Sequence, residues 1–149
     1  MLFFVAVTDN DWYRFVAEFQ PDELNFWRPT DIGFAAIEEG SPFLFKLHSP
    51  YDYIVGGGFY IRHSVLPISL AWEAFGPKNG APDAGALHQQ IQRYRGGGAS
   101  ADLDPHIGCT ILASPFFFDQ DDWIPVAGDW SPSIVRGKTY DTRERSGAA

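Results

Sequence analysis

The runs PFLFKLHSP (residues 42–50) and YIVGGGFY (residues 53–60) decide the fold of this chain. Both are dense in the apolar and aromatic residues that favour β-strands. The residues between them, Ser49 to Asp52, are rich in turn formers. The sequence therefore predicts an antiparallel pair of strands, near 43–48 and 53–63.

Three consecutive glycines, residues 56–58, interrupt the second run. Glycine leaves no side chain at places where a neighbouring backbone or a ligand approaches closely, so a binding site beside this triplet is one interpretation. A bulge or bend at the corner of a barrel is the other. The sequence leaves both open.

Apolar residues at helical spacing predict three helices. Thr8 or Asp9 can cap the first, and Pro21 ends it. The second is expected over residues 66–75, with Pro67 in its first turn, and the third over residues 83–94. The expected inward faces are Trp12, Phe15, Val16 and Phe19 in the first helix, and Leu87, Ile91 and Tyr94 in the third.

Two further strands are predicted, over residues 2–8 and 107–114. The second leads into Phe116, Phe117 and Phe118, which cannot all face one side of a strand because side chains alternate. From Lys138 to the end the chain is polar and small, and we expect it to begin a linker.

The composition fits one domain that buries a sizeable core, since 45% of the 149 residues are hydrophobic. No apolar run approaches the length of about 18 residues that a membrane span needs, so we expect no membrane association and a cytoplasmic protein. Cys109 lies in an apolar run and is expected to be a buried thiol. The histidines lie far apart in the sequence, so we expect no metal site, and we expect no cofactor.

The net charge of −8 opposes nucleic-acid binding, because phosphate contacts depend on Lys and Arg. The acidic residues are uneven, however, and crowd the first forty positions, whereas basic residues gather later. A local basic face on an acidic protein therefore remains open.

Four short elements occur in an order that resembles a known family. They are the strand at 2–8, the Trp27-Arg28-Pro29 segment, FKLHS at 45–49 and IVGGG at 54–58. This order resembles the EVE-type members of the PUA-like superfamily, whose relatives include SRA, YTH and ASCH domains. The resemblance implies an α+β fold, a small curved β-barrel with flanking helices, over residues 1–140. It also implies that residues 141–149 begin a linker to a missing domain, in such fusions often an HNH nuclease.

The resemblance implies recognition of a modified base, most readily 5-methylcytosine or 5-hydroxymethylcytosine, in double-stranded DNA. The base would flip into an aromatic pocket, as in a modification-dependent restriction endonuclease. This chain would not cut; the nuclease would lie in the missing domain, through which the protein could form a homodimer. The candidate pocket residues are Trp27, Tyr51, Tyr53, Trp72 and Phe75 as walls, and His48, Ser49 and Asn79 as hydrogen-bonding groups. The candidate phosphate contacts are Arg62, Lys78, Arg93, Arg95 and Lys138.

Each candidate also has a structural interpretation. Trp72 and Phe75 sit at helical spacing and could be core, Asn79 before Gly80 is a turn former, and surface cations are commonly only solvated. Two other function classes stay open. One is a protein- or RNA-interaction module, which for a protein partner would use the Phe116–Phe118 patch.

The other is a small ASCH-like hydrolase built from His48, Ser49 and Asp52. Neighbouring residues on a strand point to opposite faces, which argues against a bond between His48 and Ser49.

Overall fold

The computed structural model describes residues 1–30, 34, 37–95, 103–126, 128, 130, 131, 134 and 136–143. In these residues the fold is α+β, with a seven-stranded sheet in the order β2-β5-β4-β3-β1-β7 and β6 paired to β4. The strands are β1 (Leu2–Thr8), β2 (Glu23–Arg28), β3 (Pro42–Leu47), β4 (Tyr53–Pro67), β5 (His106–Phe117), β6 (Ile124–Pro125) and β7 (Gly137–Asp141). The helices are α1 (Asn10–Phe19), α2 (Ile68–Phe75) and α3 (Ala84–Arg95), with short 3₁₀ turns η1 (Gly76–Asn79) and η2 (Gln120–Asp122).

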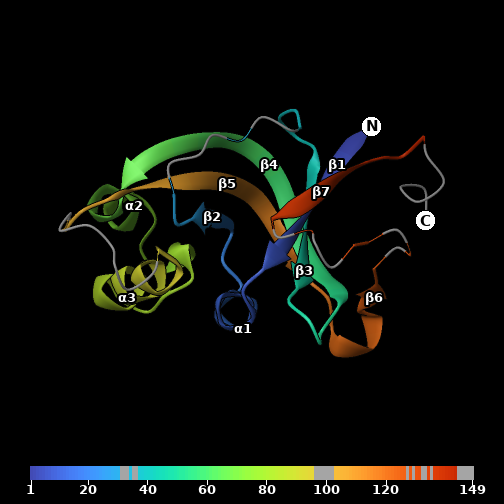
Figure 1. Cartoon of the computed structure of the whole chain (residues 1–149), viewed down its shortest axis with the longest axis horizontal. Helices are drawn as coiled ribbons and strands as arrows, with labels where there is room; N and C mark the ends of the chain where they lie inside the picture. Colours follow the sequence, from blue (N-terminus) through green and yellow to red (C-terminus); the bar gives the residue numbers. More distant parts are fainter. Residues whose placement is uncertain are drawn as a thin grey trace.

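The sheet curls over the helices. The long strands β4 and β5 form an arch, with α2 and α3 at one end of it and α1 beneath (Figure 1). Phe26 of β2 packs against Phe43 and Phe45 of β3, with ring centroids 4.9 and 5.8 Å apart, although β5 and β4 lie between these strands in the sheet. This contact across the concave side makes the sheet a partly closed barrel, as predicted.

The predicted hairpin is confirmed, with β3 and β4 antiparallel. A Cβ added at Gly56 would lie 2.3 Å from the carbonyl oxygen of Phe116 on β5, and one at Gly57 would lie 2.6 Å from that of Phe43 on β3. The pairing of β4 with β5 also shifts register between Gly57 and Phe59. The glycines therefore accommodate neighbouring strands at an irregularity, which supports the interpretation as a bulge or bend, and they do not line the cavity described below.

Helix α1 begins where the sequence predicts, because the Asp9 side chain accepts a 2.8 Å hydrogen bond from the Trp12 amide. The inward face is rotated relative to the prediction. Trp12 and Val16 are buried, but Phe19 is 45% exposed at the last helical residue. Tyr13 is buried instead and donates a 2.8 Å hydrogen bond from its hydroxyl to the carbonyl of Val55; burial raises its pKa to about 12.

Helices α2 and α3 cover the first half of β5, where a second hydrophobic cluster forms, separate from the core around Phe26, Phe43 and Phe45. Leu87 and Ile91 of α3 pack there with Ile68 of α2 and Ile107 of β5. Both helices lie close to their predicted ranges. Pro67, expected inside the first turn of α2, is the residue before the helix.

Phe116 and Phe117 at the end of β5, and Phe118 directly after it, do not all face one side, as predicted. Phe117 packs against Tyr13, 6.0 Å away between ring centroids, whereas Phe116 contacts Phe59 and Phe118. Cys109 is a buried free thiol, as expected.

The segment beginning at Lys138 is not a polar tail throughout. Residues Gly137–Asp141 form β7, which pairs antiparallel with β1 and buries Tyr140. Thr142 then exchanges hydrogen bonds with Met1. Residues 144–149, most of the expected linker, lie outside the described residues. None of the described helices is long and apolar enough to cross a membrane.

Candidate functional site

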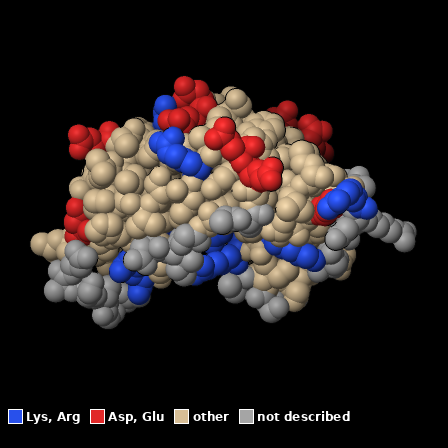
Figure 2. Space-filling model, turned by 90° about the horizontal axis from the view of Figure 1, so that it is seen from above, with Lys and Arg blue, Asp and Glu red and all other residues tan. Residues whose placement is uncertain are grey.

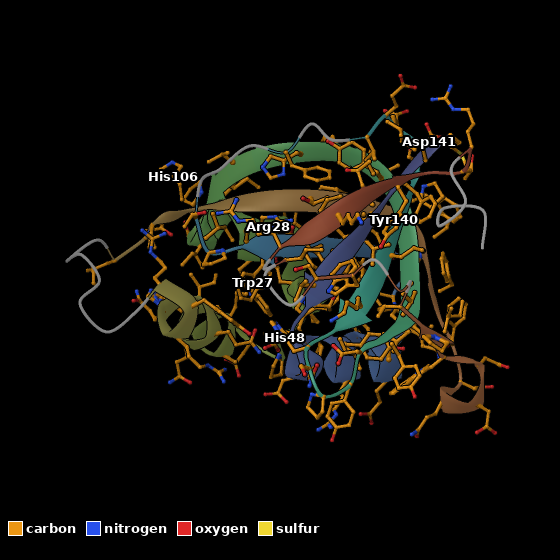
Figure 3. The ribbon with its side chains drawn as sticks, turned by 45° about the vertical axis from the view of Figure 1, so that its right-hand side comes forward. Trp27, Arg28, His48, His106, Tyr140 and Asp141 are labelled. Atoms are coloured by element: carbon orange, nitrogen blue, oxygen red, sulfur yellow. The ribbon has the colours of Figure 1, made fainter. Side chains whose placement is uncertain are left out.

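A cavity of about 420 Å³ opens beside Trp27. Its lining comes from the end of β1, the start of α1, the end of β2 and the residues that follow it, His48, Tyr94 of α3, and Arg136 just before β7. Because β2 and β7 stand at opposite ends of the strand order, the cavity lies where the two ends of the curled sheet come together. Figure 3 shows Trp27, Arg28 and His48 in the middle of the molecule, between α3 and β1, whereas His106 and Asp141 lie toward its ends.

Two tryptophans in the lining are held by one backbone oxygen. The indole nitrogen of Trp27 donates a 2.9 Å hydrogen bond to the carbonyl of Asn79, and that of Trp12 donates a 3.0 Å bond to the same oxygen. The Trp27 ring also meets Tyr94 edge to face, with centroids 6.1 Å apart. The aromatic wall therefore has a fixed orientation.

Asn79, whose carbonyl holds Trp12 and Trp27, is fully buried, and its side chain is itself held by hydrogen bonds. Its side-chain nitrogen donates to the carbonyls of Ala71 and Gly76, at 3.0 and 2.8 Å. Its side-chain oxygen accepts a 2.8 Å bond from Asn25 of β2. These bonds occupy the amide group, so Asn79 is placed to position Trp27, and it is not among the residues that line the cavity.

Replacing Asn79 with Ala should lower the free energy of unfolding by about 2 kcal/mol, because it removes the hydrogen bond from the Asn25 amide and those to the carbonyls of Ala71 and Gly76. Urea unfolding followed by tryptophan fluorescence measures the loss. Gln89→Ala, at an exposed position of α3, is the control and should change stability by less than about 0.5 kcal/mol. A loss no larger than that of the control would contradict the structural role of Asn79.

Beside the cavity, Tyr94 near the C-terminal end of α3 is hydrogen-bonded to Asp9, the N-cap of α1. The Tyr94 hydroxyl donates to one oxygen of Asp9, and the other oxygen accepts the Trp12 amide. Burial, together with this bond to Asp9, raises the pKa of Tyr94, so its hydroxyl stays protonated at neutral pH. Asp9, His48 and Tyr94 also line a second, more open hollow with Asn10 and Asp11.

Of the predicted pocket residues, the cavity brings together Trp27 and His48. Trp72 and Phe75 pack against the second hydrophobic cluster, which agrees with their structural interpretation. Tyr51 and Tyr53 are exposed around the turn between β3 and β4, where Tyr53 contacts Trp123. Ser49 lies in the same turn and outside the lining.

The predicted phosphate contacts are scattered. Lys78 forms an ion pair with Asp22 at 2.9 Å, and Lys138 lies 5.0 Å above the ring of Tyr140. Arg95 donates a 2.6 Å hydrogen bond to the carbonyl of Pro29, which itself lines the cavity. Arg62 and Arg93 are exposed.

Charge is nevertheless unevenly placed on the surface. Figure 2 shows lysine and arginine side chains mainly along one margin of the face it presents, and acidic side chains mainly along the opposite margin. An acidic chain can therefore still present a basic margin to a partner.

Sequence reasoning missed Asp9, Arg28, Tyr94 and Arg136 as residues of the cavity. Arg28 could have been identified from the sequence, because it lies between Trp27 and Pro29 in a segment that the family resemblance had singled out. Arg136 had none, because it reaches the cavity only through the pairing of β7 with β1. Tyr94 was expected on the inward face of its helix, but it is 47% exposed and faces the cavity.

The small-hydrolase alternative depended on His48, Ser49 and Asp52, of which only His48 lines the cavity. Strand β3 ends at Leu47, so the strand argument against a bond between His48 and Ser49 does not apply. Instead, the described residues that line the cavity include no Ser or Cys that could act as a nucleophile. Among the described residues, no group of three or more His, Cys, Asp or Glu is placed to hold a metal ion.

Three solved structures resemble this one, and neither a family model nor a curated protein sequence matches the chain. The crystal structure of ASCH from Zymomonas mobilis superposes with a TM-score of 0.62, covering 95% of this chain and 89% of that chain at 9% sequence identity. Crystal structures of two single-residue variants of the same protein, both 10% identical, give TM-scores of 0.57 and 0.54 and cover 90% of this chain.

At this level of identity the likeness concerns the fold alone. The ASCH domain is one of the relatives that the PUA-like resemblance implied. The chain therefore has an α+β fold of the ASCH, PUA-like type.

Proposed function

We propose that this domain binds nucleic acid and takes one unstacked base into the cavity beside Trp27. The supporting observation is a fixed aromatic wall in a cavity of about 420 Å³, within the range of about 300–1,000 Å³ usual for small-molecule sites. A base stacked on an aromatic ring gains about 1–3 kcal/mol. Trp27 offers such a face, with Tyr94 set against it.

Within this class, we propose a modified cytosine in double-stranded DNA as the ligand, in line with the EVE-type resemblance. Flipping the base costs a few kcal/mol, which stacking on one or two rings offsets. His48 and Thr30, which also line the cavity, offer hydrogen-bonding groups for the edge of the base. A subsite that fits one extra methyl group discriminates by about 1–3 kcal/mol, so the modification would be recognised by shape.

In this proposal the domain binds and does not cut. A modification-dependent restriction endonuclease needs its cleavage centre in another domain, for which an HNH nuclease is the proposed candidate. The described lining includes no Ser or Cys, in keeping with this division of roles.

Fluorescence anisotropy against matched duplexes tests the proposal. The duplexes carry cytosine, 5-methylcytosine, 5-hydroxymethylcytosine or N6-methyladenine, and are compared at low and moderate salt. One modified duplex should bind at least about 10-fold tighter than the unmodified one, equivalent to about 1.4 kcal/mol. A 2-aminopurine placed next to the target base should brighten if the base leaves the stack.

Equal affinity for every duplex, or none, would contradict recognition of a modified base in DNA. Single-stranded DNA and RNA of the same sequence are included as further ligands. Preference for RNA would keep the base-binding cavity and replace the proposed ligand class.

A further inference from the structure

Two arginines face the same cavity from opposite ends of the sheet. Arg28 is the last residue of β2 and is half-buried, whereas Arg136 is exposed and precedes β7 by one position. The carbonyl of Arg136 accepts a 2.8 Å hydrogen bond from the amide of Val7, which fixes its backbone to β1. The backbone of both arginines is therefore held by the barrel, in β2 for Arg28 and directly before β7 for Arg136.

The positive charges of Arg28 and Arg136 repel one another. Burial, with a further contribution from the charge of Arg136, lowers the pKa of Arg28 to about 10, which leaves it charged at neutral pH. No ion pair joins either arginine to a carboxylate within the described part of the chain. Asp9, the acidic residue in the described lining, is engaged by Tyr94 and the Trp12 amide.

Such an arrangement is costly, because like charges repel and a half-buried cation loses hydration. An anion bound between the two side chains would cancel the repulsion and offset the lost hydration. Guanidinium groups suit a phosphate in particular, since their planar fork forms two parallel hydrogen bonds with its oxygens.

We propose that Arg28 and Arg136 form a phosphate-binding subsite, so that the cavity holds a nucleotide whose base lies against Trp27 and whose phosphate lies between the two guanidinium groups. This inference rests on the proposed function and extends it, because the phosphate must belong to the bound nucleotide or to its immediate neighbour. The phosphate can come from a nucleic-acid strand or from a free mononucleotide, and the experiment separates these sources.

Titrations followed by NMR of the arginine side chains test the subsite with deoxycytidine, deoxycytidine 5′-monophosphate, inorganic phosphate and a short single-stranded oligonucleotide. The monophosphate should bind at least about 10-fold tighter than the nucleoside, as expected for charge-assisted bonds. Arg28→Gln and Arg136→Gln should each abolish this advantage. Arg14→Gln, on an exposed residue of α1 outside the lining, should leave it intact. Tighter binding of the oligonucleotide would assign the phosphate to a strand, and tighter binding of the monophosphate would assign it to a free nucleotide.

Equal binding of nucleoside and monophosphate, or Gln variants that behave like the unsubstituted protein, would overturn the subsite. Base recognition could survive that result, since modified duplexes would still be preferred. Conversely, inorganic phosphate that shifts the Arg28 and Arg136 resonances, without any preference among bases, would support the subsite and reject the proposed base recognition.

Discussion

Trp27→Ala should weaken binding to the preferred modified duplex by about 10- to 100-fold, because it removes the stacking face for the extruded base, worth roughly 1–3 kcal/mol. The loss on the unmodified duplex should be much smaller, since that duplex gains little from the cavity. Anisotropy titrations of both duplexes measure the difference. Equal losses of affinity for the modified and the unmodified duplex would show that Trp27 does not stack on the extruded base.

Two further variants separate stacking from folding. Trp27 donates to the Asn79 carbonyl, so its replacement also affects stability. Trp27→Phe keeps an aromatic face without that hydrogen bond and should retain most of the preference for the modified duplex. Tyr51→Ala removes an aromatic ring that is 46% exposed and outside the cavity, and it should change neither affinity.

The parts of the fold that depend on local pattern could be predicted from the sequence. The two runs of β-favouring residues within 42–60, with turn formers between them, indicated the β3–β4 hairpin, and Asp9 before an amphipathic run indicated the start of α1. Both signals involve residues within a few positions of one another, so the side chains themselves carry the information. The inward face of α1 was predicted only in part: Phe19 is exposed, and Tyr13 turns inward, where its hydroxyl donates to the carbonyl of Val55 on β4.

The cavity could be predicted only in part, because it joins residues from Val7 to Arg136. Trp27 and His48 lay in segments that the family resemblance had singled out. Arg136 depends on β7, a short and mostly polar strand in which Tyr140 is the buried residue. Asn79 looked like a turn former, and its burial follows from two tryptophans that lie 52 and 67 positions away in the chain.

Gly80→Ala should lower the free energy of unfolding by roughly 2–5 kcal/mol, combining left-handed strain with overpacking. Gly80 has a φ of +85°, and a Cβ there would lie 2.1 Å from Cδ1 of Trp12. Trp12 cannot move aside cheaply, since it is 4% exposed and packs against Phe26 and Phe45 with both ring centroids 5.3 Å away.

Gly40→Ala is the matched control, because Gly40 has nearly the same φ, +86°, but no atom lies within 4 Å of its added Cβ. It should cost only about 1–2 kcal/mol, the strain of the left-handed conformation alone. Urea unfolding of both variants therefore isolates the contact with Trp12. Because Trp12 and Trp27 share the Asn79 carbonyl, Gly80→Ala should also weaken binding of the modified duplex, whereas Gly40→Ala should not. Equal losses of stability would mean that the wall behind the cavity yields to an extra methyl group, and the fixed orientation of Trp27 would then have to be abandoned.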